Sequence, residues 1–343
     1  MGYSQWNLKF LNMKNEYTFI SVVIPIYNVA SFIARCAESL FNQSMRDGIE
    51  FIFVDDATPD NSMDVLQHCL QQHPERKGQT TILKHEKNQG LPAARNTGMK
   101  VAKGEYVFHC DSDDFLEPDA LEAMYKVAKA QNADIVWCDW FLAFDKNERY
   151  MRQPYYATAY DALKGILNGR MKYNVWNKLV RRQLYVDNDI CFPSGHGMGE
   201  DMTMIRLFAC ANKVAYVPRA FYHYVKLNGE AFTNTFSEKH LKDILFNVNQ
   251  TVDFLCKKFG RALELEVQTF KLNVKYPFLI SDDFDMYRLW EEWFPEASKA
   301  MSNTASWSLR SRILQWAAFR RQYWLLWLHY KLVYKFVYGV IYK

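Results

Sequence analysis

The chain has 343 residues, of which 49% are hydrophobic and only 14 are glycine and 10 proline, and this composition predicts a folded protein rather than a disordered or fibrous one. Its 42 basic and 38 acidic residues leave a net charge of +4, which is too small for a protein whose main task is to bind nucleic acid. The length suits two domains, or one large domain with an appendage.

From residue 19 onward, short runs rich in β-branched residues alternate with amphipathic stretches, which predicts alternating strands and helices. The predicted strands are residues 19–25, 50–54, 80–84, 105–110 and 134–138. The predicted helices lie between them, at residues 30–44, 62–73, 92–102 and 119–130. Strict alternation favours a doubly wound α/β sheet, in which ligands bind beyond the carboxyl ends of the strands.

The alternation weakens after residue 140, so the chain divides into segments of different character. Residues 246–298 are predicted to be mainly helical, and from Ser306 onward the chain is basic and aromatic without any Asp or Glu. We therefore expect an amino-terminal extension, an α/β domain, a helical extension and a tail, at residues 1–18, 19–240, 241–305 and 306–343.

Seven cysteines are scattered along the chain without a CxxC pair, so neither a zinc module nor a disulfide framework is expected. The first apolar run, residues 19–27, is short and contains Pro25, and it suits a strand better than a secretory signal. The sequence therefore predicts a cytoplasmic protein.

Polar and acidic residues gather where three of the predicted strands end. Tyr27 and Asn28 follow the first strand, Asp55 and Asp56 follow the second, and residues 111–114 follow the fourth. No GxGxxG follows the first strand and no GxxxxGK(S/T) occurs, so dinucleotide-binding and P-loop sites lose their main support. A ligand is expected at the edge of the sheet where these clusters meet.

Asp111-Ser112-Asp113 forms a D-x-D at the end of a predicted strand. Two carboxylates one residue apart in an extended segment can offer oxygens to one hard cation, Mg²⁺ or Mn²⁺, and to a ribose hydroxyl. A cation held there would neutralise a diphosphate. The alternative is a solvated turn.

The neighbouring acids and one arginine extend this picture. The pair Asp55-Asp56 could accept the imide N–H of uracil, which points to uridine, or could serve only as acids of a turn. Arg95 lies near a predicted helix start, where it could offer phosphate the bidentate donors that such oxygens favour, or it could lie on the surface. Each signal is weak alone, but all fall at equivalent strand ends.

In their order and spacing these stretches resemble the family 2 glycosyltransferases of the GT-A fold. The resemblance covers residues 19–235 and rests on residues 22–28, 53–60, 88–98, 104–114, 176–179 and 199–201. It implies a GT-A catalytic domain with a doubly wound mixed sheet and a mainly α-helical carboxyl-terminal extension. It also implies inverting, metal-dependent transfer of a sugar from a nucleotide-diphosphate donor, with UDP as the expected nucleotide. The implied acceptor is a carbohydrate or lipid-linked saccharide in bacterial surface-polysaccharide synthesis.

The resemblance assigns roles to residues of these stretches. It implies Asp113 as the ligand of Mn²⁺ or Mg²⁺, and donor-binding residues at Pro25, Tyr27, Asn28, Asp55, Asp56, Arg95, Asp111 and Ser112. Glu200 and Asp201 match the family's catalytic acidic motif, with Asp201 as the general base that takes the proton of the attacking hydroxyl. Two acids at a helix start also suit the helix dipole. Trp176 and Lys178 are expected near the acceptor, unless Trp176 belongs to the core.

The end of the matching region departs from the family pattern. The family often carries an aromatic pair followed by Arg and then Ser-x-Thr. This chain has Val225 where the Arg is expected, Lys226 directly after it, and Ala-Phe-Thr at residues 231–233. The resemblance therefore does not assign the residues that cover the bound donor on this side.

The tail carries its own pattern. On a helical wheel the basic residues Arg310, Arg320, Arg321, Lys331 and Lys335 fall within an arc of about 100°, among aromatic and aliphatic residues. Residues 323–342 have the length of a membrane span, but charged residues interrupt them. We expect peripheral association with the inner face of the cytoplasmic membrane, with a helix packed on the protein as the alternative.

Two other functions compete with sugar transfer. A sugar nucleotidyltransferase would need a glycine-rich basic loop after the first strand, where this chain has Pro25-Ile-Tyr-Asn28. A non-catalytic module that only binds sugar nucleotides would not need both Asp113 and Asp201. No nucleic-acid partner is expected.

Overall fold

The computed structural model describes residues 18–197, 199–226, 237–303 and 307–333, apart from the side chains of Asp201 and Asn303. The chain forms two compact units. The first comprises Met1–Ala159 and Tyr173–Asn247, and the second comprises Tyr160–Lys172 and Val248–Lys343. The domain boundaries predicted from the sequence remain predictions.

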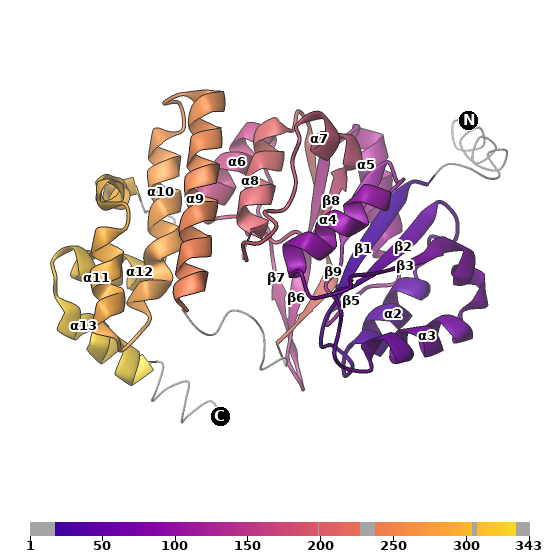
Figure 1. Cartoon of the computed structure of the whole chain (residues 1–343). Helices are drawn as coiled ribbons and strands as arrows, with labels where there is room; N and C mark the ends of the chain where they lie inside the picture. Colours follow the sequence, from indigo (N-terminus) through magenta and orange to yellow (C-terminus); the bar gives the residue numbers. More distant parts are fainter. Residues whose placement is uncertain (1–17, 198, 227–236, 304–306, 334–343) are drawn as a thin grey trace. The chain divides into compact units, whose positions relative to one another are not determined.

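The first unit is built on one mixed sheet with the strand order β3-β2-β1-β4-β8-β6-β9-β5, and β7 pairs with β6 (Figure 1). Strands β1 to β4 are parallel to one another, whereas β8 runs antiparallel between β4 and β6. The strands are β1 Ile20–Ile26, β2 Ile49–Asp55, β3 Thr80–Lys84, β4 Tyr106–His109, β5 Phe115–Leu116, β6 Ile135–Ala143, β7 Glu148–Met151, β8 Lys178–Arg181 and β9 Val214–Val225. The predicted α/β class with a doubly wound mixed sheet is confirmed.

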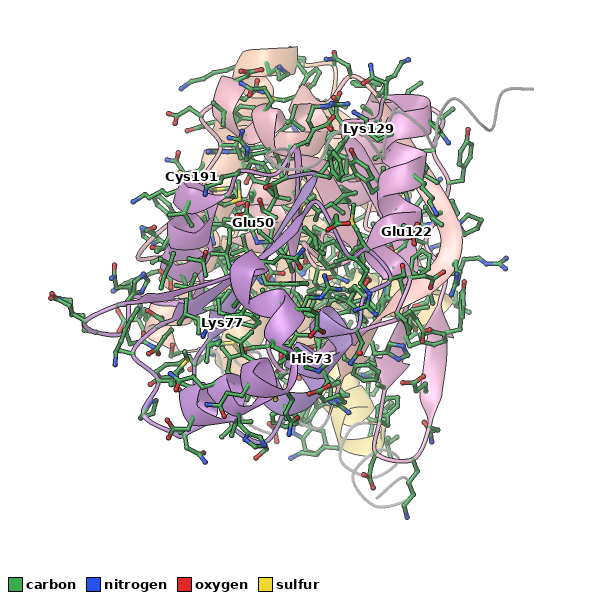
Figure 2. All side chains as sticks on the ribbon, turned by 90° about the vertical axis from the view of Figure 1, so that its right-hand side faces the viewer. Glu50, His73, Lys77, Glu122, Lys129 and Cys191 are labelled. Atoms are coloured by element: carbon green, nitrogen blue, oxygen red, sulfur yellow. The ribbon has the colours of Figure 1, made fainter. Side chains whose placement is uncertain are left out.

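Helices cover both faces of this sheet, as the alternating side chains of buried strands require. On one face, Val22 and Ile24 of β1 pack with residues of α2, α3 and α5, and on the other face Val23 packs with Ala94 of α4. The helices of this unit are α2 Ile33–Phe41, α3 Ser62–Gln72, α4 Leu91–Val101, α5 Ala120–Gln131, α7 Arg182–Asp187 and α8 Glu200–Cys210. His73, labelled in Figure 2, is the C-cap of α3. Its Nε2 lies 2.9 Å from Glu38 Oε2 of α2.

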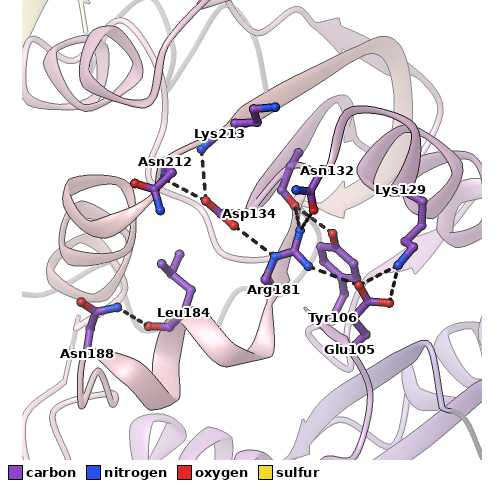
Figure 3. Close-up of polar contacts among 11 residues, drawn as sticks. Glu105, Tyr106, Lys129, Asn132, Asp134, Arg181, Leu184, Asn188, Asn212 and Lys213 are labelled. Atoms are coloured by element: carbon purple, nitrogen blue, oxygen red, sulfur yellow. Dashed lines mark hydrogen bonds and ion pairs between the residues drawn. The ribbon is translucent and has the colours of Figure 1, made fainter.

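Arg181 fixes the antiparallel strand β8 in the middle of the sheet (Figure 3). Its guanidinium donates to Asp134 Oδ1 at 3.0 Å, to Glu105 Oε1 at 3.2 Å and to Asn132 Oδ1 at 2.8 Å. Lys129 of α5 donates to the same Glu105. One side chain therefore joins the starts of β4 and β6 to the end of β8.

The second unit is helical, which confirms the predicted helical carboxyl-terminal region. Its elements include α6 Ala159–Leu167, α10 Glu264–Lys275, α11 Phe284–Glu292, α12 Leu309–Phe319 and α13 Tyr323–His329, and α9 Glu238–Phe259 enters it from the first unit. The prediction that the basic residues of the tail share one face of a single helix is wrong. Arg321 takes a left-handed φ of 57° and separates α12 from α13. Lys335 lies outside the described residues.

Candidate functional site

The loops that follow β1 and β2 are fastened to each other by backbone-to-side-chain hydrogen bonds. The N–H groups of Asn28 and Ala30 donate to Thr58 Oγ1 and Asp60 Oδ2, each at 2.8 Å. Burial would raise the pKa of Asp60, but hydrogen bonds from Ser62, Thr58 and Ala30 outweigh it and lower the pKa to about 2. Asn28 has a left-handed φ of 56°. The loop is thus shaped by an ionised aspartate.

The predicted donor residues of β1 lie at this loop. Pro25 is buried within the strand, whereas Tyr27, the residue after its end, is 48% exposed. Asn28 follows Tyr27 in the same turn. An exposed aromatic ring beside a fixed polar loop can stack on a flat ring such as a base.

Asp55 and Asp56 are both buried at the end of β2, but they make different contacts. Asp55 Oδ1 accepts the N–H of Thr58 at 2.8 Å. Asp56 accepts the N–H groups of Gln89 and Gly90 at 2.8 Å, and His85 Nδ1 lies 2.6 Å from its Oδ1. Both oxygens of Asp56 therefore already accept bonds that hold the start of α4.

Gly90 explains why the chain can turn into α4 at this point. It is the N-cap of the helix, with a φ of 88° that side-chain-bearing residues rarely adopt. Its amide is the one that Asp56 accepts, so the first turn of α4 is tied to the end of β2. This turn carries Arg95 into the interior, where its side chain is only 1% exposed.

Arg95 joins two carboxylates that are far apart in sequence. Its Nη2 donates to Asp111 Oδ1 at 2.7 Å and its Nη1 donates to Glu200 Oε1 at 2.5 Å. Burial alone would lower the pKa of Arg95, but Glu200 and Asp111 outweigh burial and raise it. The guanidinium also lies 5.4 Å from the centre of the Phe192 ring. The first acid of the D-x-D and the first acid of α8 therefore share one fixed cation.

The D-x-D loop is anchored by the residue that follows it, Asp114. Its Oδ2 accepts the hydroxyl of Tyr222 at 2.7 Å, and its Oδ1 accepts the N–H of Val225 at 2.7 Å. Tyr222 in turn accepts the N–H of Asp111 at 3.0 Å. Burial, followed by the charges of Asp113 and Asp111, raises the pKa of Asp114 well above its usual value.

This anchor bears on two further predictions. Ser112 is buried, whereas Asp113 is only partly buried, so the loop presents the second acid of the D-x-D toward its surface. At Val225, the position where Arg is usual in the family, the structure uses the backbone N–H. Lys226 is exposed, and residues 231–233 lie outside the described residues.

Glu200 is the first residue of α8, and Gly199 is its N-cap. Burial raises the pKa of Glu200, and the charge of Arg95 opposes this rise. Asp201 is the second residue of the same helix, and its side chain lies outside the described part of the structure.

The loop before α8 is held by the first turns of α9. His196 Nδ1 lies 3.0 Å from Asp243 Oδ1, and the N–H of Gly197 donates to Asp243 Oδ2 at 3.0 Å. The ring of His196 stacks on Phe246 with 3.8 Å between the ring centres. These contacts give His196 a structural role, and Asp243 is a supporting residue that no sequence pattern indicated.

Trp176 and Lys178 lie beneath the site rather than on its surface. Trp176 is 5% exposed and stacks on Tyr222 and Tyr224, with ring centres 4.4 and 5.4 Å apart. Lys178 is fully buried, and its Nζ donates to the carbonyl of Asn174 at 2.5 Å. Burial lowers the pKa of Lys178 to about 7. Contact of either residue with an acceptor remains a prediction.

The described residues contain no group of three or more His, Cys, Asp or Glu side chains placed to hold a metal ion by themselves. Mg²⁺ and Mn²⁺ in phosphate-binding sites need fewer protein ligands, because substrate oxygens and water complete the coordination shell. The D-x-D fits such a site, since the Asp113 side chain is only partly buried and the Asp111 side chain is 22% exposed.

Comparison with known proteins supports the resemblance. The sequence model described as Glycosyl transferase family 2 matches residues 21–203. The "Putative glycosyltransferase EpsH" of Bacillus subtilis is 32% identical over 217 residues, which cover 61% of this chain and 61% of EpsH. The chain therefore spans less than two thirds of that relative.

Two solved structures show the same fold. TarS 1-349 from S. aureus, in complex with UDP-GlcNAc, has a TM-score of 0.60 at 18% identity, covering 89% of this chain and 92% of that one. The mannosyltransferase PcManGT from Pyrobaculum calidifontis, in complex with GDP-Man and Mn²⁺, has a TM-score of 0.52 at 17% identity, covering 94% and 89%. The GT-A architecture predicted from the resemblance is confirmed.

Proposed function

Because the chain belongs to glycosyl transferase family 2, we propose that it is an inverting glycosyltransferase that moves a sugar from a UDP-linked donor onto a carbohydrate or lipid-linked saccharide. The observation that carries this proposal is the shared cation Arg95, which bonds both Asp111 of the D-x-D and Glu200 at the start of α8. Such a bridge brings the donor-binding loop and the catalytic helix to one place. Bacterial surface-polysaccharide synthesis is the process in which we place this transfer.

The donor would bind across the loops at the carboxyl ends of β1, β2 and β4. Tyr27 offers an exposed ring to the base, and Asp55 has one oxygen bonded to the backbone of Thr58 and the other 3.9 Å from Lys84. Asp56 supports this pocket indirectly, because both of its oxygens hold the turn before α4. TarS was solved with UDP-GlcNAc, which supports a uridine nucleotide for this chain.

Inversion requires one displacement at the anomeric carbon, in which the acceptor hydroxyl attacks from the face opposite the diphosphate. A carboxylate must take the hydroxyl proton during the attack. We assign this step to Asp201, because Glu200 is already bonded to Arg95 and successive helical residues point about 100° apart. The N-terminus of α8 further stabilises negative charge at this position.

A divalent cation, Mn²⁺ or Mg²⁺, would be held by Asp113 and would supply positive charge to the departing diphosphate. Arg95 does not replace it, because the positive charge of Arg95 is already balanced by two carboxylates. The neighbour PcManGT was solved with Mn²⁺, which supports this choice of ion.

We also propose that the protein works at the inner face of the cytoplasmic membrane through its tail, where a lipid-linked acceptor would be available. No helix in the described ranges combines the length and the apolar character needed to cross a membrane. The proposed association is therefore peripheral.

Titration of UDP into the protein with and without Mn²⁺, together with a screen of UDP-sugars for hydrolysis, tests the function. We expect Mn²⁺ to strengthen UDP binding, and Asp113→Ala to abolish that gain and most of the hydrolysis. Asp145→Ala, at an exposed acid in the turn between β6 and β7, is the matched control and should behave as the parent. Equal, metal-independent UDP affinity in all three proteins would remove Asp113 from the metal site, and no UDP binding at all would refute the donor.

A further inference from the structure

Helix α12 has one face in the core of the second unit and an apolar face in solvent. Leu314, Ala317 and Ala318 are buried on its inner side. On the outer side, large apolar side chains are exposed: Leu309 by 70%, Ile313 by 51%, Trp316 by 50% and Phe319 by 53%. Solvent exposure of four large apolar side chains on one eleven-residue helix marks an interaction surface.

Two hollows lie along this outer face, each of about 480 Å³. The first is lined by aromatic and cationic side chains that include Trp307, Arg312, Trp316, Phe319 and Arg320. The second is almost wholly apolar, and its lining includes Leu314, Ala317, Leu325, Leu328 and Leu332. Leu309 and Ile313 line both hollows, so these two residues lie between them.

The cations at this face differ from the other basic residues of the tail. Lys331 pairs with Asp282 at 2.8 Å, and Arg321 lies 3.3 Å from Glu291. Among the described residues, no carboxylate pairs with Arg312 or Arg320, and the Arg320 guanidinium lies 5.8 Å from the centre of the Trp316 ring. Two positive charges without a paired carboxylate therefore border the exposed apolar face of α12.

We propose that the α12 ridge, made of Leu309, Ile313, Trp316 and Phe319, docks on an anionic phospholipid bilayer, with Arg312 and Arg320 against lipid phosphates. This inference rests on the proposed membrane association. It assigns that association to one surface of α12, in place of the basic residues spread along the whole tail. Aliphatic and aromatic side chains enter the boundary of the acyl region, and tryptophan favours the headgroup layer. Arginine binds the phosphates as a bidentate donor.

The same charges argue against a second copy of the chain as the occupant. A two-fold interface places the same patch on both partners, so the Arg312 and Arg320 side chains of both copies would be gathered in one interface. Like charges brought together at an interface cost binding energy, whereas an anionic membrane surface attracts each of them. Charge therefore favours lipid over self-association.

Vesicle flotation of the full chain tests the proposal. The protein should float with phosphatidylcholine vesicles that contain phosphatidylglycerol and remain unbound with phosphatidylcholine alone. Arg312→Gln/Arg320→Gln should weaken partitioning about 30-fold, because each cation near an anionic surface contributes about fivefold. Arg261→Gln/Arg288→Gln, at arginines of the same unit that are 89% and 69% exposed, should float as the parent.

Apolar contact is tested separately, with Ile313→Asp/Trp316→Asp. This variant should lose flotation, and Val186→Asp, at a 57% exposed residue of the first unit, should keep it. Deletion of the tail is unsuitable because Leu314 and Leu326 belong to the core of the second unit. UDP binding should be unchanged in all variants, so loss of flotation with intact UDP binding separates this surface from donor chemistry.

Failure of the parent protein to float would overturn the proposal. Equal flotation of Arg312→Gln/Arg320→Gln, Ile313→Asp/Trp316→Asp and their control variants would overturn it as well. Concentration-dependent dimers in sedimentation that Ile313→Asp/Trp316→Asp abolishes, without vesicle binding by the parent, would assign the ridge to a second copy instead.

Discussion

Removal of the Arg95 side chain should damage both the stability and the chemistry of the protein. Arg95→Met keeps the aliphatic stem but deletes the hydrogen bonds to Asp111 and Glu200, which are 2.7 and 2.5 Å long. Hydrogen bonds to charged groups contribute about 1.5–3 kcal/mol each, and breaking a buried pair costs about 3–5 kcal/mol. Because the two acids are 22% and 28% exposed, water can partly solvate them after the change. We therefore expect a loss of about 3 kcal/mol.

Urea unfolding measures this loss in the free energy of unfolding. A second variant separates the part due to the positive charge from the part due to the planar guanidinium. Arg95→Lys keeps the charge, but an ammonium lacks the planar fork that reaches two carboxylates in different directions. It should recover about half of the loss in the free energy of unfolding. Arg288→Met, at a 69% exposed arginine paired with Asp285, is the control and should change stability by less than about 0.5 kcal/mol.

The catalytic effect follows from the charge. Burial raises the pKa of Glu200 and Arg95 opposes that rise, so Arg95→Met should raise the pKa of Glu200 further. We expect turnover to fall by about 100-fold, within the range typical of displaced catalytic groups. Unchanged unfolding midpoint and turnover in Arg95→Met would refute the reasoning from the bridge.

Three further outcomes follow from the same site. Asp201→Asn should lower turnover about 10²–10⁴-fold with UDP affinity unchanged, and near-normal turnover beside an inactive Glu200→Gln would reverse the assignment of the base. Because the pKa of Asp114 is raised in the folded state, the folded protein binds more protons at this residue than the unfolded chain, and stability should fall as pH rises above about 4. Asp114→Asn should reduce this pH dependence in thermal unfolding, whereas the control Asp119→Asn should leave it unchanged. Asp56→Ala should destabilise the protein by about 2–4 kcal/mol in urea and weaken UDP binding, because three contacts that hold the turn before α4 are lost.

The first half of the sheet could be predicted because local patterns determine it. The buried parallel strands β1, β2 and β4 have continuous apolar runs followed directly by polar loops, so these strands and the clusters at Asp55 and Asp111 could be found from the sequence. The edge strand β3 was predicted as well, although none of its residues is buried. The short antiparallel strands β5, β7 and β8 were not predicted. Their positions depend on long-range contacts such as that between Asp114 and Val225, which have no local signature.

The candidate site divides in the same way. Arg95 was predicted to face the donor, but its partner Glu200 lies 105 residues away, and no spacing rule connects them. Asp56 was predicted to bind the nucleotide because acids at strand ends often do, and its bonds to backbone amides could not be foreseen. In the tail, helical periodicity was extended across Arg321, where a left-handed backbone ends one helix before the next begins.

The contacts of Arg181 have a consequence for how sequences of this kind can diverge. Arg181, Glu105 and Asp134 are only 15–21% exposed, and one guanidinium pairs with both acids, while Lys129 also pairs with Glu105. Replacement of the arginine alone would leave Asp134 without a cationic partner and Glu105 with Lys129 only, whereas replacement of one acid would be milder because the other remains paired with the arginine. We expect lineages to lose one of the acids first and the arginine only afterwards. Pairwise swaps at these three positions should therefore show strong non-additivity in the free energy of unfolding.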